Sequence, residues 1–279
     1  FLFYISLLSD SLSDYRWKIS VLHAASKLPY DIVKELYWEA LENKNEAVVI
    51  RASAYLKDNV PKTDLRRLIN AAKAQQSIRA KSDLLARCKM LDSLKEVDDY
   101  IFEVFHQIKD QYDMANMIKS EAAGRYAFDF LEDLIKQDTT AIIRTTAFDH
   151  YIKQLEKVEY ENKLKQDEEL RNKYISSFKA AMQSGDVAIN YLGANALRNE
   201  QLPLSGWISD YSFLQECLQK LTLPLDVEAW LAVQNTLRSL SDTNYKIPPI
   251  PKGNKPIDWS ILQKVEQAKK LKFTTNKGT

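Results

Sequence analysis

The sequence predicts an all-α fold, in which antiparallel helix pairs stack into a right-handed α-solenoid followed by an extended C-terminal linker. Glycine and proline are scarce, with 6 and 8 among 279 residues, whereas a β-sandwich or barrel needs turn residues every ~8–12 positions. Apolar residues recur at helical spacing along most of the chain. The helical segments also recur in pairs, and each pair leaves an apolar face that only the next pair can cover.

Start and stop signals place the individual helices. Polar residues or a proline precede most of the apolar runs, as helix N-termini require. In chain order these residues are Asp14, Pro29, Thr63, Asp64, Asp113, Asp186 and Asp226. The helical apolar patterns cover 19–26, 32–41, 47–55, 65–72, 77–88, 97–108, 114–122, 128–135, 142–151, 170–182, 187–196, 211–218 and 227–240.

Charged segments between these helices are expected on the solvent side. The stretch 155–170 is rich in Glu and Lys and predicts an exposed helical extension. Adjacent acidic pairs, such as Asp98-Asp99 and Glu132-Asp133, are typical of solvated helix faces.

The second helices share a local pattern. Segments 46–54, 76–80 and 140–147 combine a polar start, aliphatic residues, an arginine and small residues. Segments 186–194 and 226–233 begin 40 positions apart and lack the arginine. These residues resemble HEAT repeats, over about residues 14–241 in six or seven pairs, and the resemblance implies a solenoid domain spanning 1–241. A compact helical bundle is the alternative arrangement.

The composition changes over residues 242–279. A proline-rich run at 247–256 favours an extended linker, and a short helix is expected at 257–271. The last seven residues, Phe273–Thr279, resemble the opening hairpin of cyclophilin-type peptidyl-prolyl isomerases. Helical repeats before such a hairpin are similar to bacterial multidomain isomerases. The resemblance implies a longer parent chain that isomerises proline bonds in a bacterial periplasm or envelope. The catalytic residues of that family follow the hairpin, so none is assigned here.

Charge is almost balanced, with 39 Lys and Arg against 38 Asp and Glu. A nucleic-acid-binding protein usually carries a basic excess, so no nucleic-acid partner is expected. Locally, residues 62–95 hold nine basic and three acidic residues, whereas 96–138 hold four and eleven. Solvated helix faces explain such a division. The alternative is a helical nucleic-acid-binding module that uses the basic 62–95 stretch.

No catalytic or metal-binding constellation is found. The three histidines, His23, His106 and His150, are never four residues apart, and Cys88 and Cys217 lie singly in apolar helical patterns as buried, inert thiols. We therefore expect no cofactor and no metal. No segment approaches the 18 uncharged apolar residues of a membrane-spanning helix.

A solenoid offers a concave groove lined by its second helices. The function predicted from this groove is a non-catalytic scaffold that binds protein or peptide clients. Pairing of the arginines with acids of the neighbouring repeat is the structural alternative. The candidate contact residues are Arg51, Tyr55, Arg79, Arg144, Asn190 and Asn195.

Overall fold

The computed structural model describes residues 14–92, 94–121, 127–137, 139–240 and 245–250, together with Trp259, Ser260 and Lys264. All regular structure in these residues is helical, and no strand occurs among them. The prediction of an all-α fold is therefore confirmed. The hairpin expected in 273–279 lies outside the described residues.

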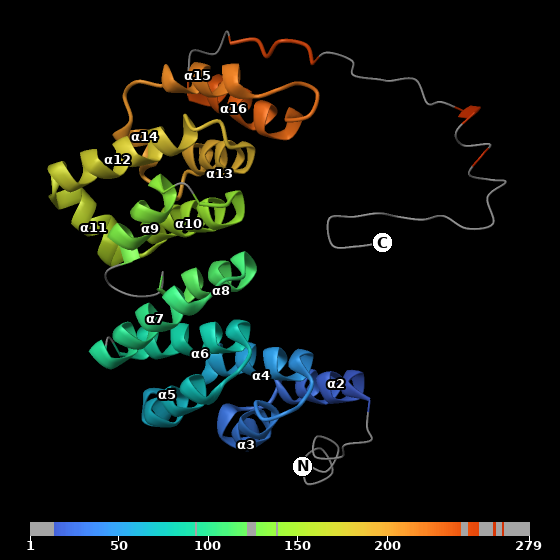
Figure 1. Ribbon diagram of the computed structural model, residues 1–279. Helices are drawn as coiled ribbons and strands as arrows, with labels where there is room; N and C mark the ends of the chain where they lie inside the picture. Colours follow the sequence, from blue (N-terminus) through green and yellow to red (C-terminus); the bar gives the residue numbers. More distant parts are fainter. Residues whose placement is uncertain are drawn as a thin grey trace.

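The helices follow one another with short connections (Figure 1). In chain order they are α2 (Tyr15–Ala25), α3 (Tyr30–Ala40), α4 (Glu46–Asn59), η1 (Lys62–Asp64), α5 (Leu65–Ala74), α6 (Ile78–Leu91), α7 (Lys95–Gln107), α8 (Gln111–Glu121), α9 (Ala127–Lys136), α10 (Ala141–Lys153), η2 (Gln154–Glu156), α11 (Val158–Gln166), α12 (Glu168–Met182), α13 (Val187–Arg198), α14 (Leu204–Trp207), α15 (Phe213–Lys220) and α16 (Val227–Leu240).

The helices form two layers. Helices α2, α4, α6, α8, α10, α13 and α16 pack side by side in chain order, each against the next, and we call them the inner layer. Helices α3, α5, α7, α9, α12 and α15 each pack on the inner-layer helix that follows, and we call them the outer layer. Figure 1 shows the two layers bent into an arc whose hollow side carries the inner layer.

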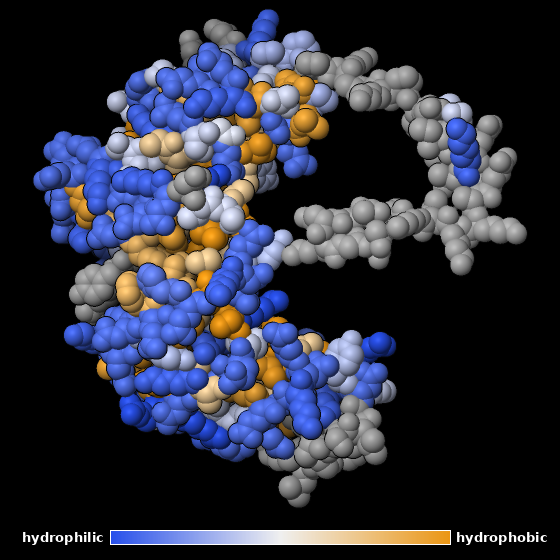
Figure 2. Space-filling model, viewed as in Figure 1, coloured by the Kyte–Doolittle hydropathy of each residue, from blue (hydrophilic) through white to orange (hydrophobic). Residues whose placement is uncertain are grey.

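The apolar core runs between the layers along the whole arc. Fully or almost fully buried side chains include Leu22 in α2, Leu84 in α6, Phe148 in α10 and Val233 in α16. Hydrophilic side chains cover most of the outside in the view of Figure 2, with apolar ones showing between the helices. Extensive contacts join only helices that are close in chain order. The apolar side of each pair, an outer-layer helix and the inner-layer helix that follows it, is therefore covered by the neighbouring pairs.

Side-chain caps explain why many helices begin where the sequence predicts. Oδ1 of Asp14 accepts from the Arg16 amide at 2.8 Å, and Oδ1 of Asp186 accepts from the amides of Ala188 and Ile189 in the first turn of α13, at 3.0 and 3.1 Å. Such caps satisfy amides that have no partner within the helix.

One start was predicted three residues late. Helix α8 begins at Gln111 and not after Asp113, because Oδ1 of Asp110 accepts from the amides of Tyr112 and Asp113. Asp110 is therefore the residue that positions this helix.

The prediction of an exposed extension at 155–170 was wrong in part. Helix α11 does form there, but Leu155 and Leu164 are almost completely buried. The high charge content obscured these two apolar positions, which attach the segment to the core. Among the described residues, no helix has the length and apolar character needed to cross a membrane.

Candidate functional site

The hollow, inner-layer side of the arc is the candidate interaction surface. Arg51 on α4 donates from Nη2 to Nδ1 of His23 on α2 at 2.8 Å, which joins two neighbouring inner-layer helices at a partly open site. Arg79 on α6 is exposed and has no hydrogen bond or ion pair with described residues. Arg51 and Arg79 are therefore accessible to a partner, as the sequence prediction requires.

Arg144 takes the structural role that was the alternative. Its Nη1 donates to the carbonyl oxygen of Thr139 at 3.0 Å, and its Nη2 lies 3.6 Å from Oδ2 of Asp186. Asp186 caps α13, so the guanidinium of Arg144 on α10 holds the beginning of the next inner-layer helix in place. The pairing predicted between an arginine and an acid of the next pair is present here.

Two of the predicted contact residues lie in the core. Tyr55 is 8% exposed and stacks on Tyr37 with ring centroids 3.7 Å apart. Asn190 is fully buried, and its Nδ2 donates to the carbonyl oxygens of Met182 and Asp186 at 3.1 and 3.0 Å. Neither side chain offers surface to a partner; Tyr55 packs α4 on α3, and Asn190 links α13 to the end of α12.

Asn195 lies on the accessible face of α13, and its Oδ1 accepts a hydrogen bond from Nη2 of Arg198. The same arrangement recurs on α16, where Nη2 of Arg238 donates to Oδ1 of Asn235 at 3.0 Å. Arg198, Asn235 and Arg238 were missed by the sequence analysis. Asp186 and Asp226 are 40 positions apart, and the same offset relates Asn195 to Asn235 and Arg198 to Arg238. Aligning the two helices at this offset would have found all three residues.

A shallow groove lies between the beginnings of α10 and α13, on the same layer. Its volume is about 520 Å³. Gly185 shapes one end with φ of +87°, a conformation that glycine adopts without strain. Exposed Val187 and, one turn further on, Tyr191 make its surroundings partly apolar. The lining residues are Ala141, Ile142, Thr145, Thr146, Gly185, Asp186, Val187 and Ala188.

Ion pairs neutralise much of the basic 62–95 stretch. Nη1 of Arg66 lies 2.8 Å from Oε1 of Glu96, and Nζ of Lys73 lies 3.7 Å from the other oxygen of that carboxylate. Arg67 pairs with Glu35 through two hydrogen bonds of 2.8 Å. Lys62 pairs with Asp92 and Lys89 with Asp98 in the same way. Glu35 lies on α3, and Glu96 and Asp98 lie on α7, so part of the uneven charge along the sequence is compensated between neighbouring helices.

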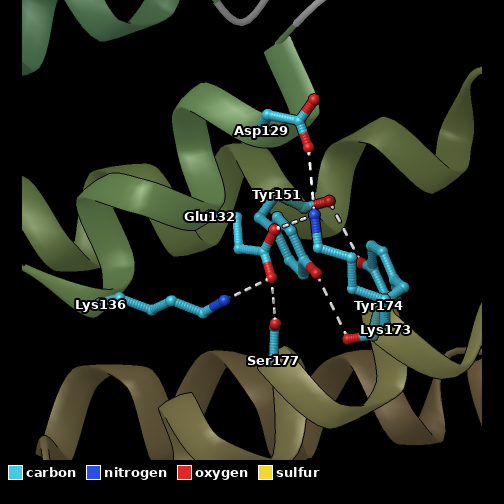
Figure 3. Close-up of polar contacts among 7 residues, drawn as sticks. All are labelled: Asp129, Glu132, Lys136, Tyr151, Lys173, Tyr174 and Ser177. Atoms are coloured by element: carbon cyan, nitrogen blue, oxygen red, sulfur yellow. Dashed lines mark hydrogen bonds and ion pairs between the residues drawn. The ribbon is translucent and has the colours of Figure 1, made fainter. Parts of the chain in front are cut away.

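A polar cluster joins α9 to α12 (Figure 3). Glu132 is only 3% exposed; its carboxylate lies 2.6 Å from Nζ of Lys136 and 2.8 Å from Nζ of Lys173, and it accepts a short hydrogen bond from Ser177. Lys173 also reaches Asp129 at 3.2 Å. The expectation that Glu132 lies on a solvated face was therefore wrong, because α12 covers it.

The electrostatics of this cluster indicate a stable carboxylate. Burial alone would raise the pKa of Glu132, but hydrogen bonds from Lys136, Lys173 and Ser177 outweigh it, so the pKa lies below its ordinary range. All acceptor atoms already face protein donors within the fold. The cluster therefore fastens two outer-layer helices together and offers no free base or nucleophile.

Two tyrosines beside the cluster are also fully engaged. The rings of Tyr151 and Tyr174 stack with centroids 4.4 Å apart, and each hydroxyl donates to the other residue's carbonyl oxygen, at 3.3 and 3.2 Å. Burial raises both pKa values above the ordinary tyrosine range. These hydroxyls stay protonated and hold α10 against α12.

The remaining reactive groups are isolated. Cys88 and Cys217 are both buried, which confirms the prediction of buried thiols, and this burial raises the pKa of each to about 12. Burial also lowers the pKa of His150 to about 4, so its imidazole is neutral at pH 7. No group of three or more His, Cys, Asp or Glu residues that could hold a metal occurs in the part of the chain that the structure describes.

Comparison with known proteins adds no relative. No protein-family model matches the chain. No curated protein and no solved structure matches it significantly either.

Proposed function

We propose that this chain is a curved α-solenoid of HEAT-like helix pairs that binds other proteins along its inner-layer face. The observation that carries the proposal is the ordered packing of the inner layer, in which each helix contacts the next in chain order. Such a layer leaves one long concave surface. The partly open side chains on it, such as Arg51, Arg79 and Asn195, suit contact with a polypeptide better than chemistry.

We further propose that the parent chain is a cyclophilin-type peptidyl-prolyl isomerase, in which the solenoid holds clients near a separate catalytic domain. This part of the proposal rests on the resemblance of residues 273–279 and on the proline-rich linker before them. A linker of that kind sets how far a captured client can reach.

The alternative of a nucleic-acid-binding module receives little support. Five of the nine basic side chains of 62–95, those of Lys62, Arg66, Arg67, Lys73 and Lys89, lie within 4.0 Å of a carboxylate. A phosphate backbone would have to compete with these internal partners, and few counterions remain to be released.

Binding of an unfolded protein tests the proposal. Reduced, carboxymethylated α-lactalbumin serves as the probe, and its affinity for the full chain is measured by fluorescence anisotropy. We expect Arg79→Glu on α6 to weaken binding several-fold, whereas the matched Arg66→Glu on the outer-layer helix α5 leaves it nearly unchanged. Absence of binding by the unaltered chain, or equal loss in both variants, would contradict the proposal.

A coupled assay on a proline-containing peptide tests whether the solenoid only binds clients while a separate domain catalyses isomerisation. Residues 1–279 alone should not accelerate cis–trans isomerisation, whereas a chain extended through the complete proposed isomerase domain should. Activity in residues 1–279 alone would overturn the assignment of catalysis to the downstream domain.

A further inference from the structure

Helices α13 and α16 present the same pair of side chains twice. They lie next to each other in the inner layer (Figure 1), and each begins immediately after an aspartate, Asp186 or Asp226. Asn195 and Asn235 are therefore the ninth residues of their helices, and the arginines three positions later correspond as well. Burial repeats too, because both asparagines are half-buried and both arginines exposed.

The hydrogen bonds at this surface leave mainly donors free. Arg198 and Arg238 each donate to the Oδ1 of the preceding asparagine, which occupies that acceptor. No described residue accepts from Nδ2 of Asn195 or Asn235. Each guanidinium also keeps further N–H groups, since arginine carries five donors and no acceptor. The surface therefore calls for a ligand rich in acceptors.

The charge at this surface is also uncompensated within the described part of the chain. Arg66 and Arg67 on the outer layer have carboxylate partners, whereas Arg198 and Arg238 have only neutral amides. Two positive charges side by side on one face favour an anionic ligand.

The spacing suits an extended chain. Packed helices lie about 8–10 Å apart, and a polyproline II segment, which is extended and has three residues per turn, advances about 3.1 Å per residue. Side chains three positions apart on such a segment point to the same side. About three residues of an extended peptide therefore separate the α13 position from the α16 position.

We propose that the surface formed by Asn195, Arg198, Asn235 and Arg238 binds an extended acidic peptide segment. The arginines pair with carboxylates about three residues apart, and the asparagine amides donate to main-chain carbonyl oxygens. This inference rests on the proposed protein-binding function and names the chemistry of the segment bound.

The experiment compares two labelled peptides of about twelve residues, one with glutamate and one with glutamine at every third position. Anisotropy titrations use the full chain, Arg198→Glu/Arg238→Glu, Asn195→Ala/Asn235→Ala and the outer-layer control Arg66→Glu, each checked for helix content by circular dichroism. We expect the glutamate peptide to bind at least tenfold more tightly than the glutamine peptide. The double arginine variant should lose that preference, the asparagine variant should weaken binding of both peptides, and the control should behave as the unaltered chain.

Other outcomes overturn the inference. These are equal affinity for both peptides, equal loss in the Arg66 control, or tighter binding of a single-stranded oligonucleotide of similar length through the same arginines. Titration of carboxymethylated α-lactalbumin on the same samples separates the two proposals. If that unfolded protein binds the inner layer while the glutamate peptide does not, only the acidic-segment inference fails; if it does not bind, the proposed function fails.

Discussion

Replacing Glu132 with glutamine should destabilise the fold by about 2–3 kcal/mol at neutral pH. The carboxylate accepts from Lys136, Lys173 and Ser177, and a hydrogen bond to a charged group contributes about 1.5–3 kcal/mol. The two lysine side chains are 56% and 48% exposed, so water can solvate them once the carboxylate is gone. The cost therefore stays below the roughly 3–5 kcal/mol of breaking a fully buried pair.

Urea unfolding followed by circular dichroism measures this difference. The matched control is Asp149→Asn, which removes a partly exposed pair with Lys153 at 2.6 Å on α10. Such pairs contribute about 0.3–0.5 kcal/mol. If the Glu132 and Asp149 variants lose the same stability, Glu132 does not fasten α9 to α12 in the manner described.

The loss should also depend on pH. Because the pKa of Glu132 is lowered on folding, its contribution is complete above the ordinary glutamate pKa of about 4.3 and disappears as pH falls through the folded pKa. The stability gap between the unaltered chain and Glu132→Gln should therefore be constant near neutrality and narrow below about pH 4. A gap that widens on acidification would refute the reasoning.

Three further outcomes are expected. Tyr55→Phe should change stability little, because the buried Tyr55 hydroxyl has no hydrogen-bond partner among the described residues. Tyr37→Phe removes a buried hydrogen bond and should cost about 1 kcal/mol, and chemical denaturation of both variants compares them. Asn190→Ala removes the amide that donates to the buried Met182 carbonyl oxygen, whereas the Asp186 carbonyl oxygen keeps the backbone amide of residue 190; the variant should lower stability by about 1–3 kcal/mol in the same assay. Cys88 and Cys217 should resist a thiol reagent at pH 8 until urea is added, since burial raises each pKa to about 12; rapid native labelling would contradict their burial.

The helices were largely predictable because their signals are local. Asp14, Ser77 and Asp186 each cap the helix that follows through a side-chain oxygen, and residues within three positions decide such a cap. Asp110 was missed because Asp113 nearby is an equally plausible cap by residue type. The arrangement of the helices into two layers required the structure, since a helical period alone does not separate a stack from a bundle.

Burial from distant segments was not predictable in the same way. Glu132 reads as a solvent-facing acid beside Asp133, and only α12, which brings Ser177 45 positions later, covers it. Tyr55 and Asn190 were placed in the groove because they are polar or amphipathic residues on second helices, but the register of each helix turned them inward. Asn195 is half-buried, and the corresponding residue on α16, Asn235, could be found only by aligning the two helices.

The most direct test of the stacked arrangement of helix pairs is amide hydrogen exchange in a variant that destabilises only the last pair. Leu237 is buried in α16, and Leu237→Ala should cost about 2–5 kcal/mol locally. If each helix pair relies only on its neighbours, amide exchange should accelerate in α13, α15 and α16 and remain unchanged in α2, α4 and α6. Equal acceleration at both ends of the chain would contradict the stack and indicate a single cooperative core.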